Sequence, residues 1–285
     1  MSALTTARTP RRARQLPTGW VLHVALLLVL AVVLLPVCLL LMNSVKTDIE
    51  IKAGPLVAPT QIQIANYYRA WVVADFSRAF LNSLVIAGSA ILGVAFLTGL
   101  SAYGLTRLRL PGADAVITYY LLAMTIPAPL FLVPLFFLWA RLGLINTLPG
   151  LVLVYLALYQ PFSIFLLRSY LLGLPQELED AARVDGCTEL QVFVNVVAPL
   201  AKPVFLTLAV LVGTWTWREF LFAVTFIHKW DLMTVALRYA RFSGQYDIDF
   251  ALQSAAGVIV ILPLMLLYLF LQRTFVQGII SGGLK

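Results

Sequence analysis

The sequence predicts an all-α membrane protein with six transmembrane helices. Of its 285 residues, 61% are hydrophobic and 12% are charged, whereas about 25% of the residues in a soluble globular domain are charged. The mean hydropathy is +0.92, and the apolar residues lie in long intervals that contain no charge. A bilayer span needs about 20 consecutive apolar residues, and several intervals reach that length. The composition therefore excludes an ordinary soluble enzyme.

Charge-free intervals locate the spans, because an ionised side chain at the bilayer centre costs about 2.5 to 3.5 kcal/mol. Five intervals qualify: 15–45, 79–106, 115–140, 142–167 and 250–272. A sixth candidate begins at Pro203, meets the adjacent charges Arg218 and Glu219, and resumes from Phe220 to Ile227. We interpret it as a span with a functional interruption.

The first interval has two possible interpretations. A cleaved secretory leader would begin with positive charge, and four arginines do precede the interval, at Arg8, Arg11, Arg12 and Arg14. The apolar run is longer than the roughly 7 to 15 residues of such a leader, and no small-residue cleavage site follows it. We therefore expect a cytoplasmic tail at 1–19, a retained helix at 20–45 and an extracytoplasmic loop at 46–78.

The rest of the chain forms the predicted transmembrane core, 79–272, and a tail at 273–285. Pro127, Pro129 and Pro134 should bend the third span, because proline removes a helix hydrogen bond. With the N-terminus inside, eleven Lys and Arg residues lie in inner connections and eight in outer ones, in the sense of the positive-inside rule. The net charge of +7 is thus explained by a bacterial-type inner or cytoplasmic membrane topology with both termini cytoplasmic, and we expect no nucleic-acid partner.

A large cytoplasmic loop, 171–203, is predicted to form two short helices. Acidic residues suit the positive N-terminal end of the first helix, and Gly186 can end it. Thr188 and Gln191 fit a capping box at the start of the second helix, and Pro199 should end that helix.

The first of these helices carries Leu178, Ala181 and Ala182 on one face. Two alanines leave a shallow surface that another protein could approach closely. Alternatively, the helix pair lies on lipid, although the five acidic residues of the loop would be repelled by an anionic inner leaflet. A protein partner is the interpretation that we favour.

The loop resembles the EAA loop of ABC importer permeases. Its run from Glu179 to Gly186, followed by Val196, Ala198 and Pro199, is similar to the pattern of E-A-A, three residues, Gly, nine residues and I-x-L-P. Asp180 stands in the place of the motif's glutamate. The resemblance implies contact with an ATPase through Glu179, Asp180, Ala181, Ala182, Asp185, Gly186 and Pro199.

The resemblance extends over nearly the whole chain and to the carbohydrate-importing branch. Six segments are similar to the smaller, six-helix subunit of maltose-type permease pairs: 66–68, 80–83, 143–147, 217–223, 272–278 and 282–285. This implies a type I ABC importer (MetI-like) transmembrane domain. The implied partners are a second homologous permease, two cytoplasmic ATPase subunits that bind ATP and Mg²⁺, an extracytoplasmic solute-binding protein, a sugar-like substrate and membrane lipid.

The chain shows no residue pattern for catalysis or cofactor binding. Of five lysines only Lys46 is followed by Ser or Thr, and no glycine precedes it at phosphate-loop spacing. His23 and His228 are isolated, which argues against a zinc pair or a histidine-based nucleophilic relay. Cys38 and Cys187 are not expected to form a disulfide. We expect no catalytic residue, metal or cofactor in this chain, and ATP hydrolysis in a separate subunit.

Five residues within the spans are candidates for a substrate path. Trp215 and Trp217 precede Arg218 and Glu219, and sugars are commonly held by aromatic faces together with polar side chains. Gln160 adds a polar group in the fourth span. Packing or an interhelical hydrogen bond is an open alternative for these residues, and Arg218 could instead extend to the outer headgroups. Successive helix residues point about 100° apart, so Arg218 and Glu219 should occupy separate environments.

We therefore expect a permease subunit of an ATP-driven importer that translocates a sugar or sugar derivative by alternating access. An importer permease for a non-sugar solute is one alternative. An ion-coupled secondary transporter is another, although it would usually carry more ionisable residues within its spans. The sequence identifies neither the sugar nor its charge.

Overall fold

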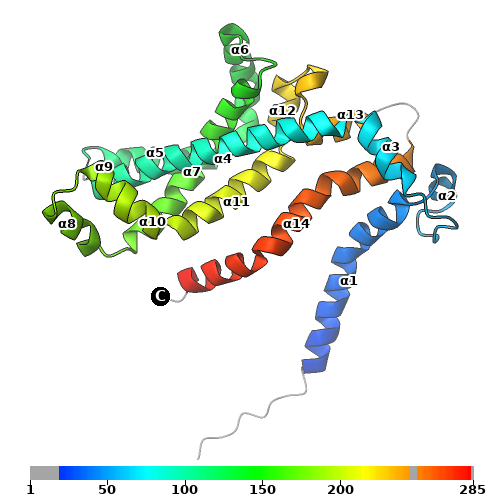
Figure 1. Ribbon diagram of the computed structural model, residues 1–285, viewed down its shortest axis with the longest axis horizontal. Coiled ribbons are helices and arrows are strands. Elements are labelled where there is room, and N and C mark those ends of the chain that lie inside the picture. Colours follow the sequence, from blue (N-terminus) through cyan, green and yellow to red (C-terminus); the bar gives the residue numbers. More distant parts are fainter. Residues whose placement is uncertain (1–18, 109, 244–248, 284–285) are drawn as a thin grey trace, which may run out of the picture.

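A computed structural model describes residues 19–108, 110–243 and 249–283 (Figure 1). These residues fold almost entirely into helices, with no β-strand among them, which confirms the predicted all-α class. Four helices are long and apolar enough to cross a membrane, and six spans result if each of two bent helix pairs counts as one. The predicted tail at 1–19 lies, except for Gly19, outside the described residues.

The four long helices are α1 (Gly19–Ser44), α4 (Phe76–Arg107), α7 (Leu148–Leu172) and α14 (Phe250–Gly283). Two further candidate spans are bent helix pairs: α5 (Ala113–Thr125) with η1 (Ala128–Phe131) and α6 (Leu132–Leu142), and the segment Glu189–Leu200 with α11 (Lys202–Arg218). Helix α12 (Leu221–Phe226) follows α11 after a break. The connections at the opposite end from the loop 171–203 contain α2 (Asp48–Ala53), α3 (Ala65–Val73), η3 (Trp230–Leu232) and α13 (Val235–Ser243). The predicted cytoplasmic loop contains α8 (Glu177–Val184), α9 (Glu189–Val192), the π-helix η2 (Phe193–Val197) and α10 (Ala198–Leu200).

The helices differ from the predicted spans mainly at their ends. Helix α4 begins at Phe76 rather than at 79, and α7 covers 148–172 rather than 142–167. Helix α14 continues to Gly283, so most of the predicted tail at 273–285 is helical. Charged residues such as Arg78 and Arg168 lie inside these helices near their ends, where a long side chain can reach water. Charge-free intervals therefore place such helix ends incorrectly.

The third span is broken rather than smoothly bent. Helices α5 and α6, with η1 between them, diverge by 96°. The break follows Ile126, whose backbone is extended because the next residue, Pro127, disfavours the helical conformation before it. Pro129 and Pro134 lie in the first turns of η1 and α6, where a missing N–H costs no helix hydrogen bond. One of the three prolines therefore accounts for the break.

Helix α4 forms the centre of the bundle and packs against α7 and α11 (Figure 1). Small residues permit this close contact, which is typical of membrane helices. A Cβ added at Gly93 would approach Leu156 of α7 within 2.6 Å, and one at Gly99 would approach Phe193 within 2.9 Å. The largest buried cluster, which includes Ile86, Leu151 and Phe226, fills the interface between α4, α7 and α12.

Helix α1 stands apart from this bundle (Figure 1). Its side chains from Trp20 to Val37 are all exposed, and its main packing partner is α14, where Leu40 lies against Gly257. The helix is strongly apolar, so lipid or another membrane protein must cover it.

Gly150→Ala should destabilise the protein. Gly150 lies in the first turn of α7, where its N–H donates to the Thr147 hydroxyl at 3.1 Å. A Cβ there would overlap the Leu144 carbonyl oxygen, a backbone atom that cannot rotate away. We expect a cost of about 1 to 3 kcal/mol, measured as a lower thermal unfolding midpoint in detergent. Gly88→Ala in α4 is the matched control, because no atom lies within 4 Å of its added Cβ. Equal midpoints for the two variants would contradict the prediction.

Candidate functional site

The predicted cytoplasmic loop forms the two capped helices that the sequence indicates. Helix α8 ends in a Schellman motif: the N–H of Cys187 donates to the Ala182 carbonyl and that of Gly186 to the Arg183 carbonyl, both at 3.0 Å. Gly186 has φ +83°, a conformation that glycine adopts without strain. Thr188 and Gln191 form the expected capping box at the start of α9. The loop is therefore an ordered unit.

Helix α8 has one buried and one exposed face. Glu179 points inward and is 2% exposed, whereas Val184 is 87% exposed. Leu178 and Ala181 are also exposed, but Ala182 is half-buried and packs under the loop. The shallow surface predicted from Leu178, Ala181 and Ala182 is therefore built from Leu178, Ala181 and Val184 instead. The three-residue spacing of these positions is visible in the sequence, but helical spacing alone does not show which face is buried.

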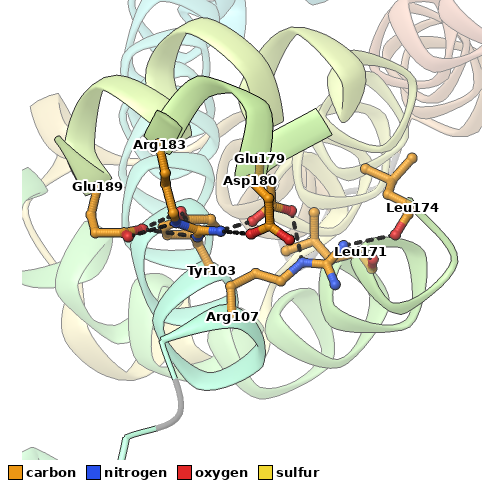
Figure 2. A network of polar contacts seen from close by, with 8 residues as sticks. All are labelled: Tyr103, Arg107, Leu171, Leu174, Glu179, Asp180, Arg183 and Glu189. Carbon is orange, nitrogen blue, oxygen red and sulfur yellow. Dashed lines mark hydrogen bonds and ion pairs between the residues drawn. The ribbon is translucent and has the colours of Figure 1, made fainter. Parts of the chain in front are cut away.

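Glu179 forms a buried ion pair with Arg107 at the C-terminal end of α4 (Figure 2). The Arg107 Nε lies 2.8 Å from a Glu179 carboxylate oxygen, and the two side chains are 8% and 3% exposed. The Nη2 of Arg107 also donates to the carbonyls of Leu171 and Leu174, at 2.7 and 2.9 Å. Three segments therefore meet at one guanidinium. Sequence reasoning placed Glu179 in the loop but did not find Arg107 as its partner.

Arg183 joins the more exposed carboxylates of the same network (Figure 2). Its guanidinium bonds to Glu189 at 2.8 Å and to Asp180 at 2.7 Å. The hydroxyl of Tyr103 in α4 donates to the second oxygen of Glu189 at 2.7 Å. The hydrogen bonds from Arg183 and Tyr103 lower the pKa of Glu189, while the pairing with Glu189 raises that of Arg183. Asp180, which occupies the glutamate position of the EAA pattern, remains mostly exposed and can reach a partner.

Pro199 does not end the second helix of the loop, contrary to the prediction. The chain stays helical through Leu200, and Pro199 lies in the first turn of α10, where its missing N–H is not needed. The preceding π-helix η2 makes the turn wider, with the Ala198 N–H donating to the Phe193 carbonyl. This bulge turns Phe193 toward α4, where its ring lies 5.3 Å from that of Tyr103.

The two tryptophans of the candidate substrate path face different neighbours. Trp217 is buried, donates its indole N–H to the Val260 carbonyl of α14 at 3.1 Å and packs against Phe80. Trp215 faces α7, with its ring 5.4 Å from Tyr159 and 5.3 Å from Phe162. Trp217 therefore packs between α4 and α14 and Trp215 against α7, and both belong to aromatic clusters next to the helix break.

The helix break at Arg218 and Glu219 separates these two residues as expected. The carboxylate of Glu219 accepts the N–H groups of Phe222 and Ala223 at 2.8 and 3.0 Å, and the hydroxyl of Tyr155 at 2.7 Å. It therefore caps α12 and joins it to α7. Arg218 is exposed and forms no hydrogen bond or ion pair with the described part of the chain.

Gln160 lies near the middle of α7. Its amide nitrogen and oxygen are buried and form no hydrogen bond with the described residues. The interhelical bond considered for Gln160 is thus not formed with any described residue. In the same residues, no group of three or more His, Cys, Asp or Glu side chains could hold a metal ion.

Bent and broken spans are joined by a loop that folds into paired helices. The same fold occurs in the crystal structure of a bacterial ABC transporter involved in the import of the acidic polysaccharide alginate. That structure superposes with a TM-score of 0.83 at 20% identity, over 93% of this chain and 99% of the other.

The chain belongs to the family of binding-protein-dependent transport system inner membrane components, whose model matches residues 95–281. It is 36% identical to the diacetylchitobiose uptake system permease NgcG of Streptomyces coelicolor, over 92% of this chain and 87% of the relative. It is 34% identical to the trehalose transport system permease SugB of Mycobacterium tuberculosis, over 90% and 94%. The melibiose/raffinose/stachyose permease MelC of Bacillus subtilis is 30% identical, over 88% and 91%.

Membership of this family confirms the predicted class. The chain is a non-enzymatic transport subunit of an ABC importer in an inner membrane, and it works with an ATPase and a solute-binding protein. These assignments agree with the predicted fold and with the expectation that hydrolysis takes place in another subunit.

Gly186→Val should lower transport and transport-stimulated ATP hydrolysis together, several-fold, while the protein still inserts. A left-handed conformation costs most residues about 1 to 2 kcal/mol and is worst for β-branched side chains, so α8 and α9 would lose their relative orientation. Gly186→Asn is the matched control, because asparagine tolerates this conformation. Uptake and hydrolysis by the purified complex in proteoliposomes measure both effects. Full coupling in the valine variant would show that the loop does not transmit the motion.

Proposed function

We propose that this chain is the permease subunit of an importer for an oligosaccharide or sugar derivative, acting by alternating access. The observation that carries the proposal is its similarity, over most of its length, to permeases named for diacetylchitobiose, trehalose and raffinose-type sugars. ATP and Mg²⁺ bind to two separate ATPase subunits, and an extracytoplasmic binding protein delivers the sugar.

A second, homologous permease completes the translocation path. The exposure of α1 supports this pairing, because a strongly apolar helix that contacts the bundle mainly through α14 offers a long surface to a neighbour. The break between α11 and α12 also supports it. Trp215 and the unpaired Arg218 lie beside that break, and a half-channel needs a facing subunit to enclose them.

The cytoplasmic loop receives the ATPase. Leu178, Ala181 and Val184 present an apolar strip on α8, and Asp180 and Asp185 flank it with exposed negative charge. An apolar centre with a polar rim is the usual composition of a protein interface. Glu179 supports this surface from inside rather than contacting the partner.

Both termini lie in the cytoplasm in this proposal, and the topology is testable with single cysteines. Native Cys38 and Cys187 are first replaced by serine. A cysteine at Asp114, exposed in the first turn of α5, should resist a membrane-impermeant maleimide in intact cells, while one at exposed Lys229 should react. The reverse labelling pattern would show that the orientation is wrong.

The sugar assignment is tested by uptake into proteoliposomes that contain the complete importer. Radiolabelled chitobiose, trehalose, raffinose and a uronate oligosaccharide are supplied with their binding protein and internal ATP. Uptake of one of these that requires ATP and resists a protonophore supports the proposal. Uptake abolished by the protonophore alone indicates ion coupling, and failure to take up any of the four sugars argues against the sugar assignment.

Arg218→Asn should change selectivity between neutral and anionic sugars. Arg218 is a full positive charge without an intramolecular partner in the described chain, so an anionic sugar is the natural counter-ion. We expect uptake of an anionic sugar to fall at least several-fold relative to that of a neutral one, measured at equal expression. Arg141→Asn is the control, since Arg141 is also an exposed arginine in the last turn of a helix. An equal change for both sugars would exclude Arg218 as a selectivity residue.

A further inference from the structure

We propose that Arg107 is a positioning residue that fixes the cytoplasmic loop to α4, and that α4 carries the loop's movement to the opposite face of the membrane. The inference rests on the proposed transport function but not on the identity of the sugar. It concerns how a displacement at the ATPase contact reaches the segment 231–238, which lies at the other end of the helix.

One face of α4 holds the whole loop. Gly99, Tyr103 and Arg107 are spaced four residues apart, so they lie in a row along the helix. Each meets a different part of the loop: Gly99 lies against Phe193 of η2, Tyr103 bonds to Glu189 of α9, and Arg107 pairs with Glu179 of α8. A movement of the loop must therefore carry the inner end of α4 with it.

Arg107 is the strongest of these attachments. Its guanidinium offers several donors in a fixed plane: Nη2 donates to the Leu171 and Leu174 carbonyls at the end of α7, and Nε lies in ion-pair contact with the Glu179 carboxylate. The pair is almost completely buried, so water does not compete for it. A lysine would keep the charge but could not make the same set of directed contacts.

The other end of α4 is attached to the connection between α12 and α14. Asn82 donates to the carbonyls of Asp231 and Met233 at 2.8 and 3.1 Å, and Ser83 accepts the Val235 N–H at 2.9 Å. Arg238, whose side chain is fully buried, pairs with Asp75 at the start of α4 at 3.0 Å. The segment 231–238 therefore follows the outer end of this helix.

Between these attachments α4 is an unbroken rod. It has 32 residues and no internal proline, which at 1.5 Å per residue gives about 48 Å. In contrast, α1, α7 and α14 contain Pro36, Pro161 and Pro263, and the two other spans are broken. Proline and helix breaks are the usual sites of bending. Among the described spans, α4 is thus the one best suited to transmit a displacement along its length.

The test measures motion at the outer end. The complete importer is prepared without Cys38 and Cys187 and with one cysteine at Asp231, whose side chain is mostly exposed. Its labelling rate by an impermeant maleimide is compared without nucleotide and after trapping with ATP and vanadate. We expect trapping to change the rate at least threefold in the parent. In Arg107→Gln the ratio should approach one, and transport should fall about tenfold while ATP hydrolysis continues.

Two further variants separate positioning from simple instability. Arg107→Lys should recover part of the trapping-dependent change. Arg168→Gln is the control, because Arg168 is a half-buried arginine near the inner end of α7 that forms no ion pair with a described residue; it should behave like the parent.

Three results would overturn the inference. In the first, trapping does not alter the labelling of Asp231→Cys in the parent. In the second, Arg107→Gln keeps the full response. In the third, Arg107→Gln reduces the amount of assembled complex while transport per complex is unchanged. If the parent shows the labelling change, Arg107→Gln loses it, and the parent takes up no sugar, the sugar assignment is refuted while the role of Arg107 is supported.

Discussion

Water does not reach the interior of a bilayer, so each backbone group released by a break in a spanning helix needs a partner within the protein. The six-residue helix α12 shows how this chain meets that requirement. At its start, Glu219 accepts two backbone N–H groups and is itself held by Tyr155 of α7. Just after its end, Asn146, which precedes α7, accepts the N–H groups of His228 and Lys229. The interruption is thus fixed to α7 at both ends.

The same constraint decides where charge is tolerated. Arg107 and Glu179 are buried because they satisfy each other and the carbonyls of the last turn of α7. Removing either partner would leave a buried charge, which is far more costly than never having buried the pair. Arg218, without such a partner, is exposed. Arg107 and Arg218 both lie at helix ends, but the paired arginine is buried and the unpaired one is exposed.

Much of the fold could be predicted from the sequence, because charge-free length and capping residues are local properties. The spans, the capping box at Thr188 and the stop at Gly186 all depend on residues within a few positions of one another. The inward direction of Glu179 could not be predicted, since its partner Arg107 lies on another helix.

The candidate site shows the same limit. Trp215 and Trp217 are indistinguishable by composition, yet one faces α7 and the other α14. The continuation of the helix through Pro199 depends on a π-helix. Neither hydrophobic periodicity nor capping residues indicate a π-helix.

The contact between α1 and α14 has a consequence for biogenesis. The spanning part of α1 packs mainly on α14, so α1 contacts a helix that is synthesised about 200 residues after it. Domains fold largely in the order of synthesis, but this contact has to wait until nearly the whole chain has been inserted. During that interval α1 is an unaccompanied apolar helix, and membrane chaperones or a partner subunit can bind it before α14 does. The α1–α14 contact therefore forms only after α14 has been inserted.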